Sequence, residues 1–108
     1  MADELTNREY AALWFEDVAE KTSRLTSGNV SHQGNTIRGL AKCSAEYLEK
    51  WGEKNDDLLE KAIGWFHTIE NDCLMLTSGN VSHQGATIRG RAIRCAEYIR
   101  KHIGCIRS

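Results

Sequence analysis

The residues best suited to chemistry lie in a polar segment that occurs twice, at residues 26–39 and 77–90, as TSGNVSHQG followed one residue later by TIRG. A helix that begins inside this segment would attract anions with its free backbone N–H groups. Hydroxyls, amides and a guanidinium suit a phosphate group, and the histidine could bond a base or a sugar. The segment therefore predicts non-enzymatic binding of a small phosphorylated or otherwise anionic ligand, a nucleotide being one example. The predicted ligand-binding residues are Ser27, Asn29, Ser31, His32, Thr36 and Arg38, with Ser78, Asn80, Ser82, His83, Thr87 and Arg89 in the second copy.

Part of the repeated segment forms a stripe with helical spacing i, i+4, i+7. The stripe consists of His32, Thr36 and Gly39 in the first copy and His83, Thr87 and Gly90 in the second. A glycine exposed inside a helix costs about 1 kcal/mol relative to alanine, so its presence in both copies indicates that something approaches the backbone there. The stripe could pack against the other hairpin or contact a ligand. The alternative function is a helical protein-protein interaction or oligomerisation module that uses this stripe.

Catalysis has less support in the sequence than binding. Ser31 and His32 are adjacent, so on a helix they point about 100° apart and cannot form a nucleophile and its base. The segment also lacks the GxxxxGK[ST] pattern of a phosphate-binding loop. We therefore predict no catalytic residue and no cofactor.

Two acidic pairs resemble a known enzyme motif. Asp17 with Glu20, and Glu46 with Glu49, are similar to the paired acidic motifs of the all-helical nucleotide pyrophosphohydrolases, which bind magnesium through them. With a turn centred near residue 28, however, the two pairs should lie far apart along the hairpin. The second copy also disrupts the pattern, with an arginine at position 100. We therefore assign the chain to no family and predict no metal site.

The elements that must position the polar segment also repeat. Shifted by 51 residues, residues 25–50 match residues 76–101 at 19 of 26 positions, whereas upstream only Glu9, Ala11, Trp14 and Phe15 find identical partners. The second half of each copy has therefore stayed similar while the first half has diverged. We predict one domain spanning residues 1–108, built from two helical hairpins at residues 4–51 and 55–102.

Local signals place the helices. The capping box from Thr6 to Glu9 predicts a helix from Asn7, which should end near residues 27–29 with Gly28 in a left-handed cap. A second helix follows at once, and Asp56 or Asp57 can cap the third after a linker at residues 52–57. Apolar and small residues alternate in steps of four and three along the second helix of each hairpin, which is typical of a buried seam. The seam contains Val30, Gly34, Ile37, Ala41, Ser44, Leu48 and Trp51, repeated as Val81, Gly85, Ile88, Ala92, Cys95 and Ile99.

Four helices joined by short connections predict an all-α fold, an up-down-up-down four-helix bundle of tandem duplicated hairpins with pseudo-twofold symmetry. Both polar turns would then lie at the same end of the bundle. The two copies could form one composite site or two separate sites. A pseudo-twofold site would suit a symmetric ligand.

Composition narrows the environment and the partners. The chain is 41% hydrophobic and 27% charged, no apolar run reaches the roughly 20 residues that span a bilayer, and the N-terminus is acidic and polar. We expect a cytoplasmic protein without membrane contact. The sequence after Arg89 is rich in basic residues, but acidic neighbours such as Asp56, Asp57 and Glu60 could neutralise it, which disfavours nucleic acid as a partner.

The cysteines do not predict a metal or disulfide framework. The four cysteines, Cys43, Cys73, Cys95 and Cys105, form no CxxC pair, and Cys43 aligns with Arg94 in the other copy. A metal or disulfide framework duplicated with the rest of the chain would have cysteines at equivalent positions in both copies. We expect reduced, partly buried thiols that act as small apolar side chains.

Overall fold

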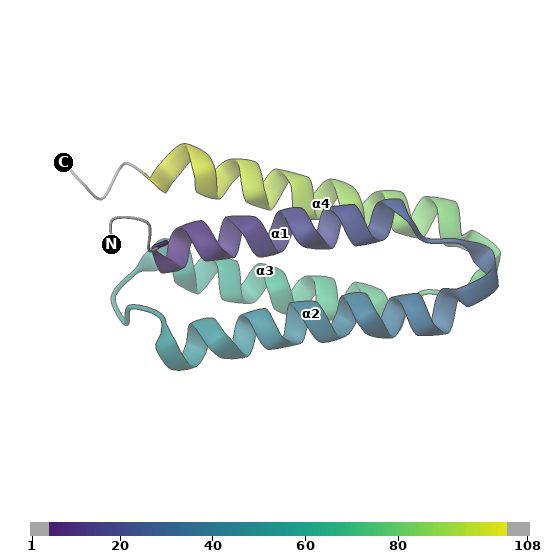
Figure 1. Cartoon of the computed structure of the whole chain (residues 1–108), viewed down its shortest axis with the longest axis horizontal. Helices are drawn as coiled ribbons and strands as arrows, with labels where there is room; N and C mark the ends of the chain where they lie inside the picture. Colours follow the sequence, from purple (N-terminus) through teal and green to yellow (C-terminus); the bar gives the residue numbers. More distant parts are fainter. Residues whose placement is uncertain (1–4, 104–108) are drawn as a thin grey trace.

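The computed structural model describes residues 5–103 as a bundle of four helices (Figure 1). These are α1 (Asn7–Ser23), α2 (Val30–Trp51), α3 (Asp57–Leu74) and α4 (Val81–His102), and short 3₁₀ turns, η1 (Ser27–Asn29) and η2 (Ser78–Asn80), precede α2 and α4. This part of the chain contains no strand. The predicted all-α four-helix bundle is confirmed. Within the described residues, no helix is long and apolar enough to cross a membrane.

The closest helix contacts join the two hairpins to each other. Helix α1 packs most closely on α4, and α2 packs most closely on α3, whereas the helices of one hairpin contact each other less. The repeated glycines permit this approach. A Cβ atom on Gly34 would lie 3.1 Å from Cδ1 of Leu76, and one on Gly85 would lie 3.1 Å from Cδ1 of Leu25. Each glycine therefore accommodates a leucine from the opposite hairpin.

The core follows the predicted seam. Val30 to Leu48 on α2 and Val81 to Ile99 on α4 are buried at the predicted positions. Phe15 and Phe66, one from each hairpin, are fully buried and stack with ring centroids 3.9 Å apart. Trp51 was predicted to extend the seam, and that prediction is wrong. It is the last residue of α2 and remains 62% exposed, with the Lys50 ammonium group 5.3 Å from its ring centroid.

The predicted helix starts are confirmed, whereas the predicted end of α1 is wrong. Thr6 and Glu9 form the capping box, and Asp56 caps α3 by accepting bonds from the next backbone N–H groups. Helix α1 ends at Ser23, before the expected 27–29. The N–H groups of Arg24 and Leu25 close the last turn with i to i−3 bonds, so no left-handed residue is needed. Accordingly, no glycine within residues 5–103, Gly28 included, has a positive φ.

A buried ion pair joins three helices at the end opposite the polar turns. The guanidinium of Arg8 on α1 donates hydrogen bonds of 2.8 and 2.7 Å to the Asp56 carboxylate, which caps α3. It also donates to the carbonyl of His102 on α4, at 3.1 Å. Burial alone would raise the pKa of Asp56, but the bonds from Arg8 and from backbone N–H groups outweigh it, and the pKa is lowered.

The basic last helix lies beside acidic residues, as expected, but its ion pairs involve other acids than those named. Asp57 lines a hollow with Tyr98 and His102 of α4, whereas Asp56 pairs with Arg8. Arg91 pairs with Asp72 at 3.0 Å, and Arg100 pairs with Glu16 at 2.7 Å. Glu16 lies beside Arg100 because α4 packs most closely on α1.

The buried cysteines behave as apolar residues. Cys73 and Cys95 lie in the core, and burial raises the pKa of the Cys73 thiol to about 12 and that of Cys95 to about 11. Both are therefore neutral at physiological pH. Cys43 is exposed, contrary to the expected partial burial, because it lies on the outer side of α2. Cys105 falls outside the described residues.

An ion pair joins α1 to α4, and another joins α2 to α3 at the equivalent positions. The acid and the base have exchanged places between the two pairs. Glu16 on α1 and Arg100 on α4 correspond, after the 51-residue shift, to His67 on α3 and Glu49 on α2. His67 Nε2 lies 3.3 Å from Glu49, and Nδ1 lies 3.3 Å from Glu70. Hydrogen bonding to Glu49, with a smaller contribution from Glu70, raises the pKa of His67 against the effect of burial.

Because the α2/α3 ion pair contains a histidine, its contribution to the free energy of unfolding should depend on pH. Because the folded pKa of His67 exceeds its unfolded value of about 6.5, the stabilisation is complete below that pH and is lost as pH rises through the folded pKa. The side chains are half exposed, so we expect less than about 1 kcal/mol. Denaturant melts across this range should show the loss, and His67→Gln should remove it. Glu16→Gln, the control, should leave it in place.

Candidate functional site

The two polar turns lie beside each other at one end of the bundle, where α2 and α4 begin (Figure 1). Asn29 and Asn80 occupy the N-cap positions of these helices and are exposed, and neither side chain caps its helix with a hydrogen bond. The first turn of a helix leaves backbone N–H groups without intrahelical partners. This end of the bundle thus presents two helix starts that no side chain at the N-cap covers.

The repeated glutamines shape both turns. Gln84 Nε2 donates to the Met75 carbonyl at 2.9 Å, and its Oε1 accepts from the Thr77 N–H at 3.0 Å. In the first copy, Gln33 makes the same two bonds to the backbone at residues 24 and 26. The glutamine belongs to the repeated polar segment but not to the predicted ligand-binding residues. Its role in the fold is to close the turn before each helix.

The two hydrogen bonds of each glutamine form a clamp on its turn, and removing this clamp should destabilise the turn. Two hydrogen bonds to the backbone are lost in Gln84→Ala, and at about 0.5–1.5 kcal/mol each they predict a loss of roughly 1–3 kcal/mol in the free energy of unfolding. Urea denaturation followed by circular dichroism measures it. His83→Ala, the exposed neighbour, serves as the control and should change stability by less than about 0.5 kcal/mol. Equal stability of Gln84→Ala and the parent would contradict the clamp.

Two equivalent hollows flank the helix starts. One, of about 180 Å³, lies between α2 and the end of α3, and the other, of about 300 Å³, lies between α4 and the end of α1. Every lining residue of the second hollow is the 51-residue counterpart of a residue in the first. The identical pairs are Val30 and Val81, Ser31 and Ser82, Gly34 and Gly85, Arg38 and Arg89, and Leu76 and Leu25.

The two arginines differ in how they are paired. Arg38 lies 3.9 Å from Glu70, at the limit of an ion pair, and its Nε atom is buried without a hydrogen-bond partner. Arg89 is exposed, and no carboxylate among residues 5–103 forms an ion pair with it. Each hollow therefore combines a serine hydroxyl with a guanidinium that retains donor capacity.

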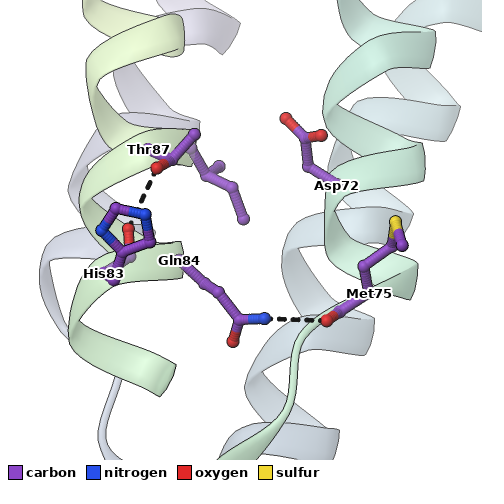
Figure 2. A pocket seen from close by; sticks show the side chains of 6 residues that line it. Asp72, Met75, His83, Gln84 and Thr87 are labelled. Carbon is purple, nitrogen blue, oxygen red and sulfur yellow. Dashed lines mark hydrogen bonds between the residues drawn. The ribbon is translucent and has the colours of Figure 1, made fainter.

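The histidine and threonine of the stripe lie outside these two hollows. His32 and Thr36 are exposed, and the Thr36 hydroxyl donates to the His32 carbonyl at 3.1 Å. In the second copy, Figure 2 shows His83 and Thr87 on α4 across from Asp72 on α3 and Met75 just after it, where they line a separate hollow of about 140 Å³. The stripe thus faces outward and does not pack against the other hairpin.

The structure therefore brings together only part of the predicted set. Ser31 and Arg38 line one hollow, and Ser82 and Arg89 line the other, but the two hollows lie between different helix pairs and form no single cavity. The side chains of Ser27 and Ser78 lie outside what the structure describes. Sequence reasoning missed the residues that the opposite hairpin contributes to each hollow. The repetition of the leucine at positions 25 and 76 was the one available signal.

Comparisons of the chain with protein-family models, with curated proteins and with solved structures give no match. Within residues 5–103, no three histidine, cysteine or carboxylate side chains gather closely enough to hold a metal ion. The two equivalent hollows and the exposed stripe are the features of the described residues that indicate a function.

Proposed function

We propose that the protein binds a small phosphorylated or otherwise anionic ligand, without catalysis, in the two hollows beside the starts of α2 and α4. The observation that carries this proposal is their equivalence. The serine and the arginine are the same in both, although neighbouring positions have diverged, as at Asn35 and Ala86. A guanidinium and a hydroxyl in a small hollow beside the start of a helix suit a phosphate group.

Two separate sites are proposed in preference to one composite site. The hollows lie between different helix pairs, and each is completed by a leucine from the opposite hairpin. Each is also small, so the anionic group and its immediate neighbours would be enclosed while the rest of the ligand extends into solvent. A nucleotide could bind in this way through its phosphate groups.

Thermal-shift screening against nucleotides, cyclic dinucleotides and sugar phosphates provides the first test, because a ligand that binds only the folded state raises its apparent stability. For the best ligand, Arg38→Ala or Arg89→Ala should each remove about half of the binding capacity in a calorimetric titration. Loss of a charged hydrogen bond, roughly 1.5–3 kcal/mol, corresponds to at least about a tenfold weaker affinity at the altered site. Neither substitution should cost more than about 0.5 kcal/mol of stability.

Arg24→Ala is the matched control, because Arg24 is an exposed arginine at the same end of the bundle but lies outside both hollows. Its loss should leave affinity and capacity unchanged. If each single arginine variant abolished all binding, one composite site would replace the two proposed sites. A double variant that bound every ligand normally would show that the function lies elsewhere.

A second candidate function, a protein-protein interaction or oligomerisation module, is favoured by one observation. Apart from its chain neighbours and its own helix backbone, a Cβ on Gly39 would meet no described atom within 4 Å, and one on Gly90 would meet only the end of the Arg94 side chain, at 3.4 Å, so packing within the described residues does not require the repeated glycine. A partner helix lying on His32, Thr36 and Gly39 would explain it. A screen without any stabilising ligand, together with a concentration-dependent molecular mass, would favour this function over anion binding.

A further inference from the structure

The α3/α4 face carries a groove that the two hollows of the proposed function do not include. Three hollows of about 140, 260 and 190 Å³ follow one another along it, each lined by residues of both helices. Met75 and Thr87 lie at the end near the polar turns, Trp65 and Arg94 lie in the middle, and Lys61 lies towards the opposite end. We refer to this surface as the α3/α4 groove.

The equivalent face of the first hairpin provides an internal comparison. Its aromatic framework is the same, because Trp14 meets Tyr47 edge to face at 5.4 Å as Trp65 meets Tyr98 at 5.5 Å. What differs is the residues around this framework. The substituted positions, first copy before second, are Leu40 and Arg91, Cys43 and Arg94, and Tyr10 and Lys61. The second copy has therefore exchanged an aliphatic, a thiol and an aromatic side chain for three cations.

These exchanges also change the shape of the face. In the first copy, Leu40 packs against the core, and the Tyr10 ring stacks on Trp14 with centroids 5.7 Å apart. In the second copy, Arg94 is exposed and lines the middle hollow, while the Lys61 ammonium group lies 5.7 Å from the Tyr98 ring centroid. The same scaffold is thus covered by apolar groups in one hairpin and lined by cations in the other.

The charges within the groove are unevenly compensated. Asp72 is paired with Arg91 at 3.0 Å, and Arg8 is paired with the buried Asp56. Asp57 lines the hollow near Lys61. Arg94 forms no ion pair with any described carboxylate, so the middle of the groove has a net positive charge. A partner that complements it carries carboxylates or phosphates.

The apolar residues of the groove favour a partner with carboxylates, a peptide, over a partner with phosphates, a single-stranded nucleic acid. Met75 is 72% exposed at the end of the groove, and an exposed methionine is typical of surfaces that bind apolar side chains of peptides. Single-stranded nucleic acid needs free aromatic faces on which bases can stack. Tyr98 already stacks on His102 at 4.1 Å and meets the edge of Trp65.

We propose that the α3/α4 groove binds an acidic peptide segment of a partner protein, with carboxylates at Arg94 and Lys61 and an apolar side chain at Met75. This site is independent of the two anion hollows of the proposed function. It overlaps the repeated stripe at one end, where His83 and Thr87 line the same hollow as Met75, but its defining cations have no counterpart in the first copy.

A fluorescein-labelled peptide in which each leucine is followed by two glutamates serves as the probe. The full chain should raise its fluorescence anisotropy, and the same peptide with lysines in place of the glutamates should not bind. Reversing both cations in Arg94→Glu with Lys61→Glu should weaken binding by at least about tenfold, since charge-assisted bonds are lost. Met75→Ser should weaken it separately. Both altered cations are exposed, and circular dichroism checks that the variant stays folded.

Lys42→Glu is the matched control for Arg94→Glu and Lys61→Glu taken singly, because it makes the same charge change as either of them at an exposed position on α2 in the first copy. It should bind the probe as the parent does. An equal loss in Lys42→Glu would show attraction by net charge alone and would overturn the proposal. The proposal would also be overturned if single-stranded oligothymidine displaced the peptide and bound the Arg94 and Lys61 variant more weakly than the parent. The groove would then bind nucleic acid. Because Arg38→Ala with Arg89→Ala should still bind the peptide, the two proposals can fail separately.

Discussion

Phe66→Ala should lower the free energy of unfolding by about 3–5 kcal/mol, as is usual when a buried phenylalanine is truncated. Phe66 is fully buried at the centre of the bundle and stacks on Phe15 with the ring planes only 1° apart. Trp14 on α1 also contacts its ring, with centroids 6.5 Å apart. Truncation would therefore leave a cavity where the two hairpins meet, and equilibrium urea denaturation would measure the loss.

The pseudo-twofold arrangement extends this prediction to Phe15→Ala, which should cost a similar amount. Because the two rings contact each other, the double variant should cost less than the sum of the single variants. Leu13→Ala is the control, since Leu13 lies on the same helix but is 41% exposed, and it should cost far less. A Phe66→Ala protein as stable as the parent would show that the two hairpins are not joined through this stack.

Asp56→Ala, at the end of the bundle away from the polar turns, should lower the free energy of unfolding by a similar amount, about 3–5 kcal/mol. The substitution removes the carboxylate that balances the buried Arg8 guanidinium, and it also removes the N-cap of α3. Asp57→Ala is the matched control, because it lies next in the sequence but is exposed. Thermal and urea denaturation of both variants should separate them clearly.

The lowered pKa of Asp56 adds a dependence on pH. A carboxyl group with a lower pKa in the folded state than in the unfolded state contributes stability above its unfolded pKa, about 3.9, and loses it as pH falls through the folded value. The parent should therefore lose stability in acid more steeply than Asp56→Ala does. Parallel acid profiles of the two proteins would contradict this role.

The local structure could be predicted from the residues because its causes are local. The Thr6 and Glu9 capping box, the seam from Val30 to Leu48 and the Asp56 cap depend on neighbours within a few turns. The end of α1 could not be predicted. It depends on backbone bonds of Arg24 and Leu25 and on a clamp from Gln33, nine residues beyond the carbonyl of Arg24 that it binds.

The candidate site, too, could be predicted only in part from the sequence. Repetition in the sequence alone identified Ser31 and Arg38 with Ser82 and Arg89 as residues to consider. Helical spacing also places His32 about 100° from Ser31, but it could not show which of the two faces meets the opposite hairpin, because that depends on which helix occupies the space beside α2 and α4. The serine and arginine face the end of a helix from the opposite hairpin, and the stripe faces solvent.

The helices, their order, the buried seam and the duplication follow from the residues alone, since hydrophobic periodicity and capping act within each element. The pairing of α1 with α4 and of α2 with α3 became known from the folded arrangement. Both helices of either hairpin carry an apolar face, so several pairings would bury it. The choice depends on the fit of Leu25 on Gly85 and Leu76 on Gly34, contacts between residues far apart in the chain.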